Sequence, residues 1–342
     1  MSTIDTLKLN EQIWDTYSCK HEYDNDCYNS RYTRGDMVEP INPIVSDYLY
    51  DNGFRITYPG NKKFTLCLTH DIDDIYPPLF HTMNDIYHSL KNIDLNKLNK
   101  NIFWRFKGKH CSPYWNFKEI MEIEKKYDGV STFYFLTSNK DPKRFRYNIE
   151  DLDIELGHIV DNGCEVGLHG GYYSFQDFNM IRQEKNRLER CLGRNIIGYR
   201  NHYLRFKVPD TWKILKEVGF KYDSTFGYNN AIGFRNGMCY PFKPFDIIEN
   251  KEIDLIEIPM AIMDVTLFNS TDSFGDLWTK SKNLIDGVSK INGVLTLLWH
   301  NNVFYSYNKL NWVKLYNKIL EYCYENNAWI TSGENVYDWW KT

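Results

Sequence analysis

The chain of 342 residues lacks any apolar run long enough to span a bilayer. Its first residues, MSTIDTLKLNEQIWD, have neither the basic start nor the apolar core of a secretory signal. Positive charge is not in excess either, because the net charge is -4 and the isoelectric point is near 6.2. Such a balance gives no electrostatic footprint for nucleic acid. We therefore expect no transmembrane segment and no nucleic-acid partner.

Paired cysteines are also missing from the sequence. Eight cysteines are scattered along the chain without a C-x-x-C pair. Cys67 and Cys164 fall inside apparent strands, where a free thiol packs as a small hydrophobic side chain. This distribution favours a reducing compartment over a disulfide framework, and we expect a cytoplasmic location.

What the sequence does contain is an alternation of strand-like and helix-like patterns. The composition, 42% hydrophobic and 25% charged, is typical of a globular protein. Strand-like runs and helical patterns alternate seven or eight times, which predicts an α/β fold with a parallel sheet closed into a (β/α) barrel. We expect this barrel over residues 61–342, with an N-terminal extension over 1–60. The runs expected to be strands are 64–69, 130–136, 164–168, 196–199, 255–259, 294–299 and 328–330.

The sequence also predicts individual helices and the character of the C-terminal residues. Residues 45–50 predict a short helix closed by Asn52-Gly53, and Met83 to Leu98 has helical spacing. A polar tail is expected after the last strand.

Ionisable side chains follow most of the expected strands. In a (β/α) barrel the loops after the strands meet at one face, where active sites lie. An Asp-rich loop that caps the next helix is the alternative interpretation of THDIDD taken alone. The recurrence of a strand followed by ionisable side chains favours one shared site. The residues that follow the successive strands are Asp71 and Asp73; His169; Arg200 and His202; Asp223; Asp264; and His300.

The chemistry of this set is that of metal-assisted hydrolysis. Aspartate and histidine side chains suit zinc or another divalent first-row metal, which can polarise a carbonyl. A second carboxylate can take a proton from water, a histidine can protonate the leaving group, and an arginine can fix the charge state of the base. These parts suit the hydrolysis of an amide or an ester. No G-x-S-x-G motif supports a serine nucleophile.

The order of these motifs resembles the polysaccharide deacetylase superfamily, carbohydrate esterase family four and its relatives. Thr69-His70-Asp71-Ile72-Asp73 is similar to a T-H-D-[IV]-D variant of the first family motif. His169 matches the first histidine of H-[ST]-x-x-H, and Arg200-Asn201-His202-Tyr203 resembles R-x-P-[YF]. Asp223-Ser224 and Leu297-Leu298-Trp299-His300 resemble the fourth and fifth motifs. The likeness runs from about residue 64 to 332 and implies a distorted (β/α) barrel with a divalent metal.

The resemblance implies roles for individual residues. Asp71 would be the catalytic base, held by Arg200, and His300 the general acid. Asp73 and His169 would bind the metal, with the Asp71 and Asp73 roles open to exchange because Ile72 separates them. The residues expected to contact substrate are Tyr203, Asp223, Arg235, Asp264 and Trp299.

The third metal ligand departs from the family pattern. The second family histidine would fall at Tyr173, and tyrosine is a poor zinc ligand. We expect His202 to replace it, with Asp264 and Asp74 as the alternatives. Zinc is the expected metal, and cobalt, nickel and manganese are the alternatives.

The expected function is removal of an N-acetyl or similar acyl group from an amino sugar of a glycan or glycan precursor. A nucleotide- or lipid-linked sugar used in surface polysaccharide synthesis would suit a cytoplasmic enzyme. Arg235 could clamp an anionic group of such a substrate, or make a local ion pair. The alternatives are an amidohydrolase acting on a small non-sugar amide and an inactive barrel that binds glycan. The sequence does not predict the oligomeric state.

Overall fold

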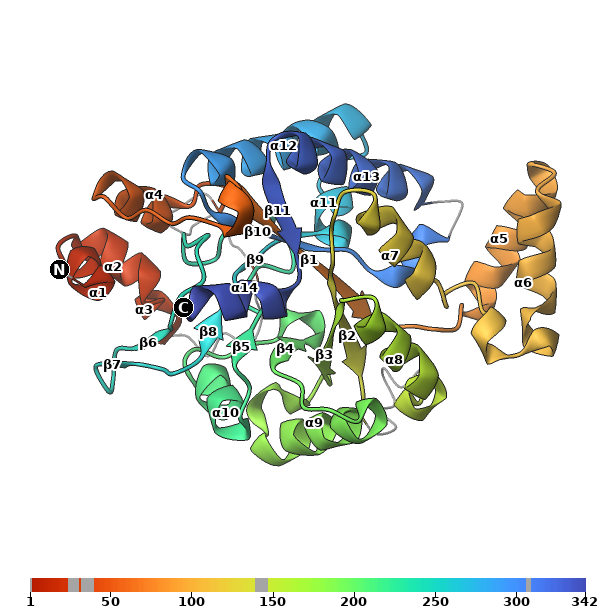
Figure 1. The fold of residues 1–342 in the computed structure, drawn as a ribbon, viewed down its shortest axis with the longest axis horizontal. Coiled ribbons are helices and arrows are strands. Elements are labelled where there is room, and N and C mark those ends of the chain that lie inside the picture. Colours follow the sequence, from red (N-terminus) through yellow and green to blue (C-terminus); the bar gives the residue numbers. More distant parts are fainter. Residues whose placement is uncertain (1, 24–30, 32–39, 139–146, 306–308) are drawn as a thin grey trace.

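A computed structural model of the chain describes residues 2–23, 31, 40–138, 147–305 and 309–342. Its centre is a curled sheet of parallel strands surrounded by helices (Figure 1). The strand order is β8-β5-β4-β3-β2-β1-β10-β9, with β11 beside the first half of β1. The strands are β1 Phe64–Ile72, β2 Thr132–Leu136, β3 Glu165–Gly170, β4 Gly198–Asn201, β5 Tyr222–Asp223, β8 Ile256–Glu257, β9 Met260–Met263, β10 Val294–Leu298 and β11 Ala328–Thr331.

The sheet confirms the expected distorted (β/α) barrel. Its two ends, β8 and β9, are joined through Ile258 and Pro259. The expectation of one strand over 255–259 is wrong, because this stretch turns at a proline, which cannot donate to a sheet ladder. β8 pairs with β5, whereas β9 pairs with β10.

Helices cover the outside of the sheet (Figure 1). Strand β1 is buried along its whole length, as expected for a strand with helices on one face and the barrel interior on the other. The helices that follow β1 in the barrel are α5 Leu79–Lys91, α6 Leu95–Lys107, α7 Phe117–Lys125, α8 Asp153–Asp161, α9 Phe178–Leu192, α10 Asp210–Val218, α11 Asp264–Asn269, α12 Phe274–Lys290, α13 Leu310–Glu325 and α14 Gly333–Trp340.

Two of these helices correct the sequence expectations. The spacing over Met83 to Leu98 predicted one helix, but α5 ends at Lys91 and α6 begins at Leu95. Ile93 lies between them with φ of 55°, and the Asp94 side chain caps the amide of Lys97. The expected polar tail is helix α14, capped by Ser332. Its first amides donate to side chains at the starts of β2 and β3, so α14 lies at the N-terminal end of the barrel.

The residues before β1 form helices α1 Thr3–Lys8, α2 Glu11–Tyr17, α3 Lys20–Tyr23 and α4 Ile44–Asp51. The expected helix over 45–50 is confirmed as α4. Leu7, Val45 and Leu49 are buried in the same hydrophobic cluster as the barrel helices. The boundary near residue 60 stays a prediction. A small antiparallel pair, β6 Phe245–Asp246 and β7 Lys251–Glu252, lies outside the main sheet.

No helix among the described residues has the length and apolar character of a membrane span. The seven described cysteines are all free thiols; Cys27 lies outside the described residues.

Candidate metal and catalytic site

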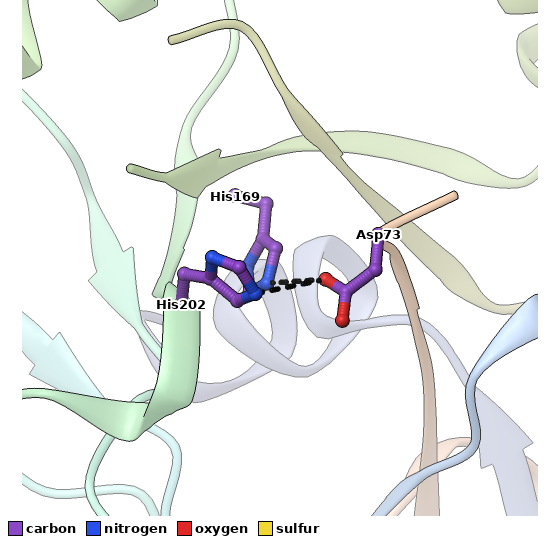
Figure 2. A group of neighbouring side chains, drawn as sticks. All are labelled: Asp73, His169 and His202. Carbon is purple, nitrogen blue, oxygen red and sulfur yellow. Dashed lines mark ion pairs between the residues drawn. The ribbon is translucent and has the colours of Figure 1, made fainter. Parts of the chain in front are cut away.

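Three side chains meet at the C-terminal ends of β1, β3 and β4. Asp73 follows β1, His169 lies near the end of β3, and His202 follows β4, all with their polar atoms directed at one another (Figure 2). Asp73 Oδ1 lies 3.4 Å from Nε2 of His169 and 3.4 Å from Nε2 of His202. One ligand atom from each residue lies within 4.8 Å of the others. The structure thus brings together the three residues expected to bind a metal.

These residues fit a divalent metal. A tetrahedral zinc with bonds of about 2.0–2.1 Å has ligand atoms roughly 3.4 Å apart, which matches the two separations from Asp73 Oδ1. That oxygen is buried and makes no hydrogen bond to the described residues. His169 Nδ1 donates to the carbonyl of Arg200 at 3.0 Å, so its Nε2 keeps a lone pair in the neutral ring. The donor set of two imidazoles and a carboxylate, with an acceptor fixing one ring, fits a divalent metal ion.

The backbone after β4 is shaped to aim His202 at this cluster. Tyr203 and Leu204, the next two residues, have φ of 60° and 51°. Positive φ is uncommon for residues other than glycine, and it marks sites where the surroundings hold a strained turn. The tight turn brings the His202 ring to 5.1 Å from the His169 ring, centroid to centroid.

Opposite charges set the protonation of the cluster. Burial alone would raise the pKa of Asp73, but the imidazoles of His202, His169 and His300 outweigh it and hold that pKa well below its usual range. Burial would likewise lower the pKa of His169, but Asp71 and Asp73 raise it. The cluster therefore pairs an ionised carboxylate with imidazoles.

Asp71 is held in a separate, fully buried arrangement by Arg200. Arg200 Nη1 donates to Asp71 Oδ1 at 3.2 Å and to Thr69 Oγ1 at 2.6 Å. Its Nε and Nη2 donate to the carbonyl and the hydroxyl of Ser224, at 2.9 and 2.8 Å. The other Asp71 oxygen, Oδ2, lies 3.6 Å from His169 Nε2. One carboxylate oxygen is thus fixed by an arginine while the other faces the cluster.

His300 also lies beside the cluster, with Nε2 3.8 Å from Asp73 Oδ2. Its Nδ1 hydrogen-bonds Asp264 Oδ1 at 2.8 Å, and its amide donates to Asp264 Oδ2 at 2.8 Å. Burial alone would lower the pKa of His300, but Asp264 outweighs it and raises the pKa to about 9. Asp264 therefore orients His300 rather than joining the three-residue cluster, for which it was an alternative ligand.

The cluster opens into a cavity of about 570 Å³. Tyr203 lies at its wall and is 41% exposed, as expected for a substrate contact. Its ring lies edge-on to that of Tyr172, with centroids 5.6 Å apart. Cavity residues that the sequence analysis missed are Arg31, Leu204, Asn229, Asn230, Met263, Val265, Thr266, Asn269 and Ser270. They come from loops, from a short 3-10 turn, from the last residue of β9 and from α11, and none of them is an ionisable side chain directly after an expected strand.

Outside the cavity lining lie four of the predicted substrate residues: Asp223, Arg235, Asp264 and Trp299. Trp299 is fully buried and packs against Phe268 and Tyr316, so its ring belongs to the core. Asp223 is buried beneath the site, accepts a hydrogen bond from Thr225, and has a pKa raised to about 6 by burial.

Arg235 makes the local ion pair that was its alternative interpretation. Its Nε and Nη2 donate to the Glu22 carboxylate at 2.8 and 2.6 Å, and the side chain is buried. The guanidinium is therefore turned to an N-terminal helix and does not line the cavity.

Two other residues weighed for the site also lie outside the cluster. Asp74 is buried but is not grouped with the three metal-directed side chains. Tyr173 is 48% exposed, with its ring against Tyr172.

His70 faces away from the cluster, into the helix layer. Its Nε2 lies 2.7 Å from Glu124 Oε1, and its Nδ1 lies 2.7 Å from the carbonyl of Trp299. Tyr316 and Ser131 also donate to the Glu124 carboxylate. This network ties β1 to the strand end that carries His300.

Comparison with known proteins shows a likeness in the fold. The chain superimposes on two solved structures assigned as polysaccharide deacetylases. One is from Mycobacterium smegmatis, with a TM-score of 0.54 and 16% identity, covering 83% of this chain and 92% of that one. The other is from Pseudomonas aeruginosa PAO1, with a TM-score of 0.52 and 14% identity, and the same two coverages. The expected resemblance is therefore confirmed in the fold, whereas the T-H-D-[IV]-D subgroup stays a prediction.

Sequence comparison gives a shorter match. A peptidoglycan deacetylase-like protein, FGM2 of Gibberella zeae, is 24% identical over 133 residues. These cover 33% of this chain and 38% of that protein, so the match spans well under half of either. No protein-family model matches the chain.

Proposed function

We propose that this chain, which has the fold of the polysaccharide deacetylases, is a metal-dependent hydrolase that removes an N-acetyl or similar acyl group from an amino sugar. The observation that carries the proposal is the Asp73, His169 and His202 cluster, flanked by a buried Asp–Arg pair and by a histidine held by an aspartate. The substrate would be a glycan or a glycan precursor for surface polysaccharide, handled in the cytoplasm.

Each side chain has a definite task in this proposal. A divalent metal held by Asp73, His169 and His202 would supply Lewis-acid polarisation of the acyl carbonyl. Asp71 takes the proton of the attacking water through Oδ2, because Arg200 occupies Oδ1.

His300 protonates the departing amine. Its Nδ1 is held by Asp264, which leaves Nε2 directed toward the cluster. A histidine with a raised pKa keeps its proton near neutral pH until the amine needs it. Base and acid thus both lie next to the three metal-directed residues.

The first test measures metal content beside activity. Wild type, His169→Ala and His202→Ala would be loaded with zinc, and acetate release from N-acetylglucosamine oligomers would be followed. We expect one tightly bound zinc and acetate release in the wild type, and loss of both in each variant. His158→Ala, an exposed histidine on α8, is the matched control and should keep both.

Other outcomes of this test would favour one of the alternative functions. Zinc binding with acyl release only from small non-sugar amides would favour the amidohydrolase. Absence of a bound metal under supplementation with zinc, cobalt, nickel or manganese would overturn the mechanism and favour a glycan-binding barrel. Loss of metal in His169→Ala but not in His202→Ala would mean that the third ligand is a residue other than His202.

A further inference from the structure

The hairpin of helices α5 and α6 projects from the barrel, on the side away from the N-terminal helices (Figure 1). It follows β1 directly after the Asp73 loop, so it belongs to the end of the barrel that carries the metal-directed cluster. The Tyr76 ring stacks on Trp104 at 5.7 Å, and Lys97 Nζ donates to the carbonyl of Tyr305 at 3.2 Å. These contacts fix the hairpin to the segments that follow β1 and β10.

The outer face of the hairpin is apolar and exposed. Phe80 is 78% exposed, Ile93 81% and Phe106 86%. On α5 the exposed apolar residues fall within an arc of about 100°, and those on α6 do the same. The exposed apolar face consists of Leu79, Phe80, Met83, Tyr87, Leu90, Ile93, Leu95, Ile102, Phe103 and Phe106.

The inner face of the hairpin is largely polar. Thr82, Asp85 and Ser89 of α5 and Asn101 of α6 are buried, and Trp104 of α6 is the one apolar side chain buried with them. The hydroxyls of Thr82 and Ser89 donate to carbonyls of their own helix. A helix that packs on a water-soluble core normally buries its apolar stripe and exposes its polar one. This hairpin instead buries mostly polar residues and exposes its apolar stripe, which suits an outer face that meets an apolar medium. Small and polar residues at a helix–helix contact are typical of helices in lipid.

The charge of the hairpin indicates which apolar medium its outer face contacts. Residues 79–107 hold five Lys or Arg and two Asp, a net charge of +3, whereas the whole chain carries -4. Lys91, Arg105 and Lys107 are exposed beside the apolar face. A second copy of the chain would set the same basic surface against itself across a two-fold axis. An anionic lipid surface complements both the apolar face and the basic residues.

We propose that the α5–α6 hairpin docks this protein peripherally on an anionic membrane surface. The apolar face enters the interface between headgroups and acyl chains, and the basic residues contact lipid phosphates. Docking in this way holds the catalytic end of the barrel beside the bilayer. The inference rests on the hairpin alone and does not depend on the proposed deacetylase activity.

The test is flotation of the purified full chain with vesicles. One set is phosphatidylcholine alone, and the other contains equal parts of phosphatidylcholine and phosphatidylglycerol. The variants are Phe80→Ser with Phe106→Ser, and Lys91→Gln with Lys107→Gln. The matched controls are Ile154→Ser with Ile248→Ser, two exposed isoleucines away from the hairpin, and Lys126→Gln with Lys290→Gln.

We expect the wild type to bind the anionic vesicles, and the double serine variant to bind at least about ten-fold more weakly. The double glutamine variant should bind more weakly to anionic vesicles only, and high salt should weaken wild-type binding. Both controls should bind as the wild type does. A melting temperature equal to that of the wild type shows that each variant is folded.

Three results would overturn the proposal. The first is a wild type that stays unbound with both vesicle types, and the second is a set of hairpin variants that bind as tightly as the controls. A wild-type dimer in solution that the double serine variant converts to a monomer, without vesicle binding, would instead assign the face to a second copy.

Discussion

Asp71 and Asp73 lie two residues apart and face different partners, which shows how closely placed acids can differ in chemistry. Asp71 lies in a buried ion pair with Arg200, whereas Asp73 faces imidazole nitrogens. Residues two apart on a strand point to the same side of the sheet, so both carboxylates reach the barrel interior. Arg200 therefore distinguishes the two carboxylates, because its side chain contacts Asp71 and none of Asp73, His169 and His202.

Arg200→Lys tests this separation. Lysine offers a single point charge in place of the planar fork, so it cannot reach both Asp71 and the two Ser224 oxygens. We expect the free energy of unfolding to fall by about 3 kcal/mol, as when a buried pair is broken. We expect kcat for acyl release to fall by at least about 100-fold, as when a proton-transfer group loses its position. The metal content should not change.

Urea unfolding, metal analysis and steady-state kinetics measure these three quantities. The matched control is Arg187→Lys, which alters a bidentate pair with Glu150 at the surface and should cost less than about 1 kcal/mol. Loss of metal in Arg200→Lys would show that Arg200 belongs to the metal site itself.

At the scale of single elements, the sequence predicted the strands better than the turns between them. The strand that carries Asp71 begins at Phe64 as expected, because an unbroken apolar run needs no knowledge of its neighbours. The expected grouping of Asp73, His169 and His202 likewise followed from strand ends meeting at one face.

Features set by tertiary contacts were out of reach. The break between α5 and α6 depends on a left-handed residue at Ile93, which a β-branched side chain does not predict. Helix α14 is short, and it is held by side chains from β2 and β3 that are distant in sequence. The ion pair of Arg235 depends on Glu22, more than two hundred residues away.

The contact of α14 with β3 makes stability depend on pH. Glu165 at the start of β3 accepts hydrogen bonds from Thr132, from Tyr222 and from the amide of Glu334. Burial outweighs these bonds and raises the pKa of Glu165 from 4.5 to about 7. The folded state therefore holds this proton more tightly than the unfolded state does, and the associated stability is complete below pH 4.5 and is lost as the pH rises through 7.

Glu165→Gln removes this titration. We expect the free energy of unfolding of the variant, relative to the wild type, to rise by about 3 kcal/mol between pH 4 and pH 8. Urea unfolding of both proteins across this range measures the difference, and other titrating groups cancel in it. A difference that does not change with pH would contradict the raised pKa.

At the scale of the whole molecule, the segment before β1 is tied to the barrel by a buried charge pair. Arg235 lies in the loop between β5 and β6, and Glu22 lies on α3. Removing one partner leaves the other charge buried without compensation. We expect Glu22→Ala to lower the free energy of unfolding by about 3 kcal/mol, whereas Asp15→Ala, which loses only a surface pair with Lys20, should cost less than about 1 kcal/mol.

Urea unfolding followed by both fluorescence and circular dichroism measures this cost. A single shared transition would show that residues 1–60 unfold together with the barrel. Two transitions, with Glu22→Ala affecting only the first, would show that the extension is a separate unit.

The proposed metal links strands that are distant in sequence, and this predicts its effect on global stability. Asp73, His169 and His202 follow or end three different strands, so unfolding separates the three ligands completely. A ligand that binds only the folded state stabilises it according to its concentration relative to Kd. At a zinc concentration about 1,000 times Kd, we expect the free energy of unfolding to rise by about 4 kcal/mol over the chelator-treated protein. Thermal unfolding with increasing zinc measures this rise.

His169→Ala should show almost none of it, because one ligand is lost, whereas the control His158→Ala should show all of it. Equal responses of the two variants would mean that zinc acts elsewhere on the chain, and the three-ligand site would have to be abandoned.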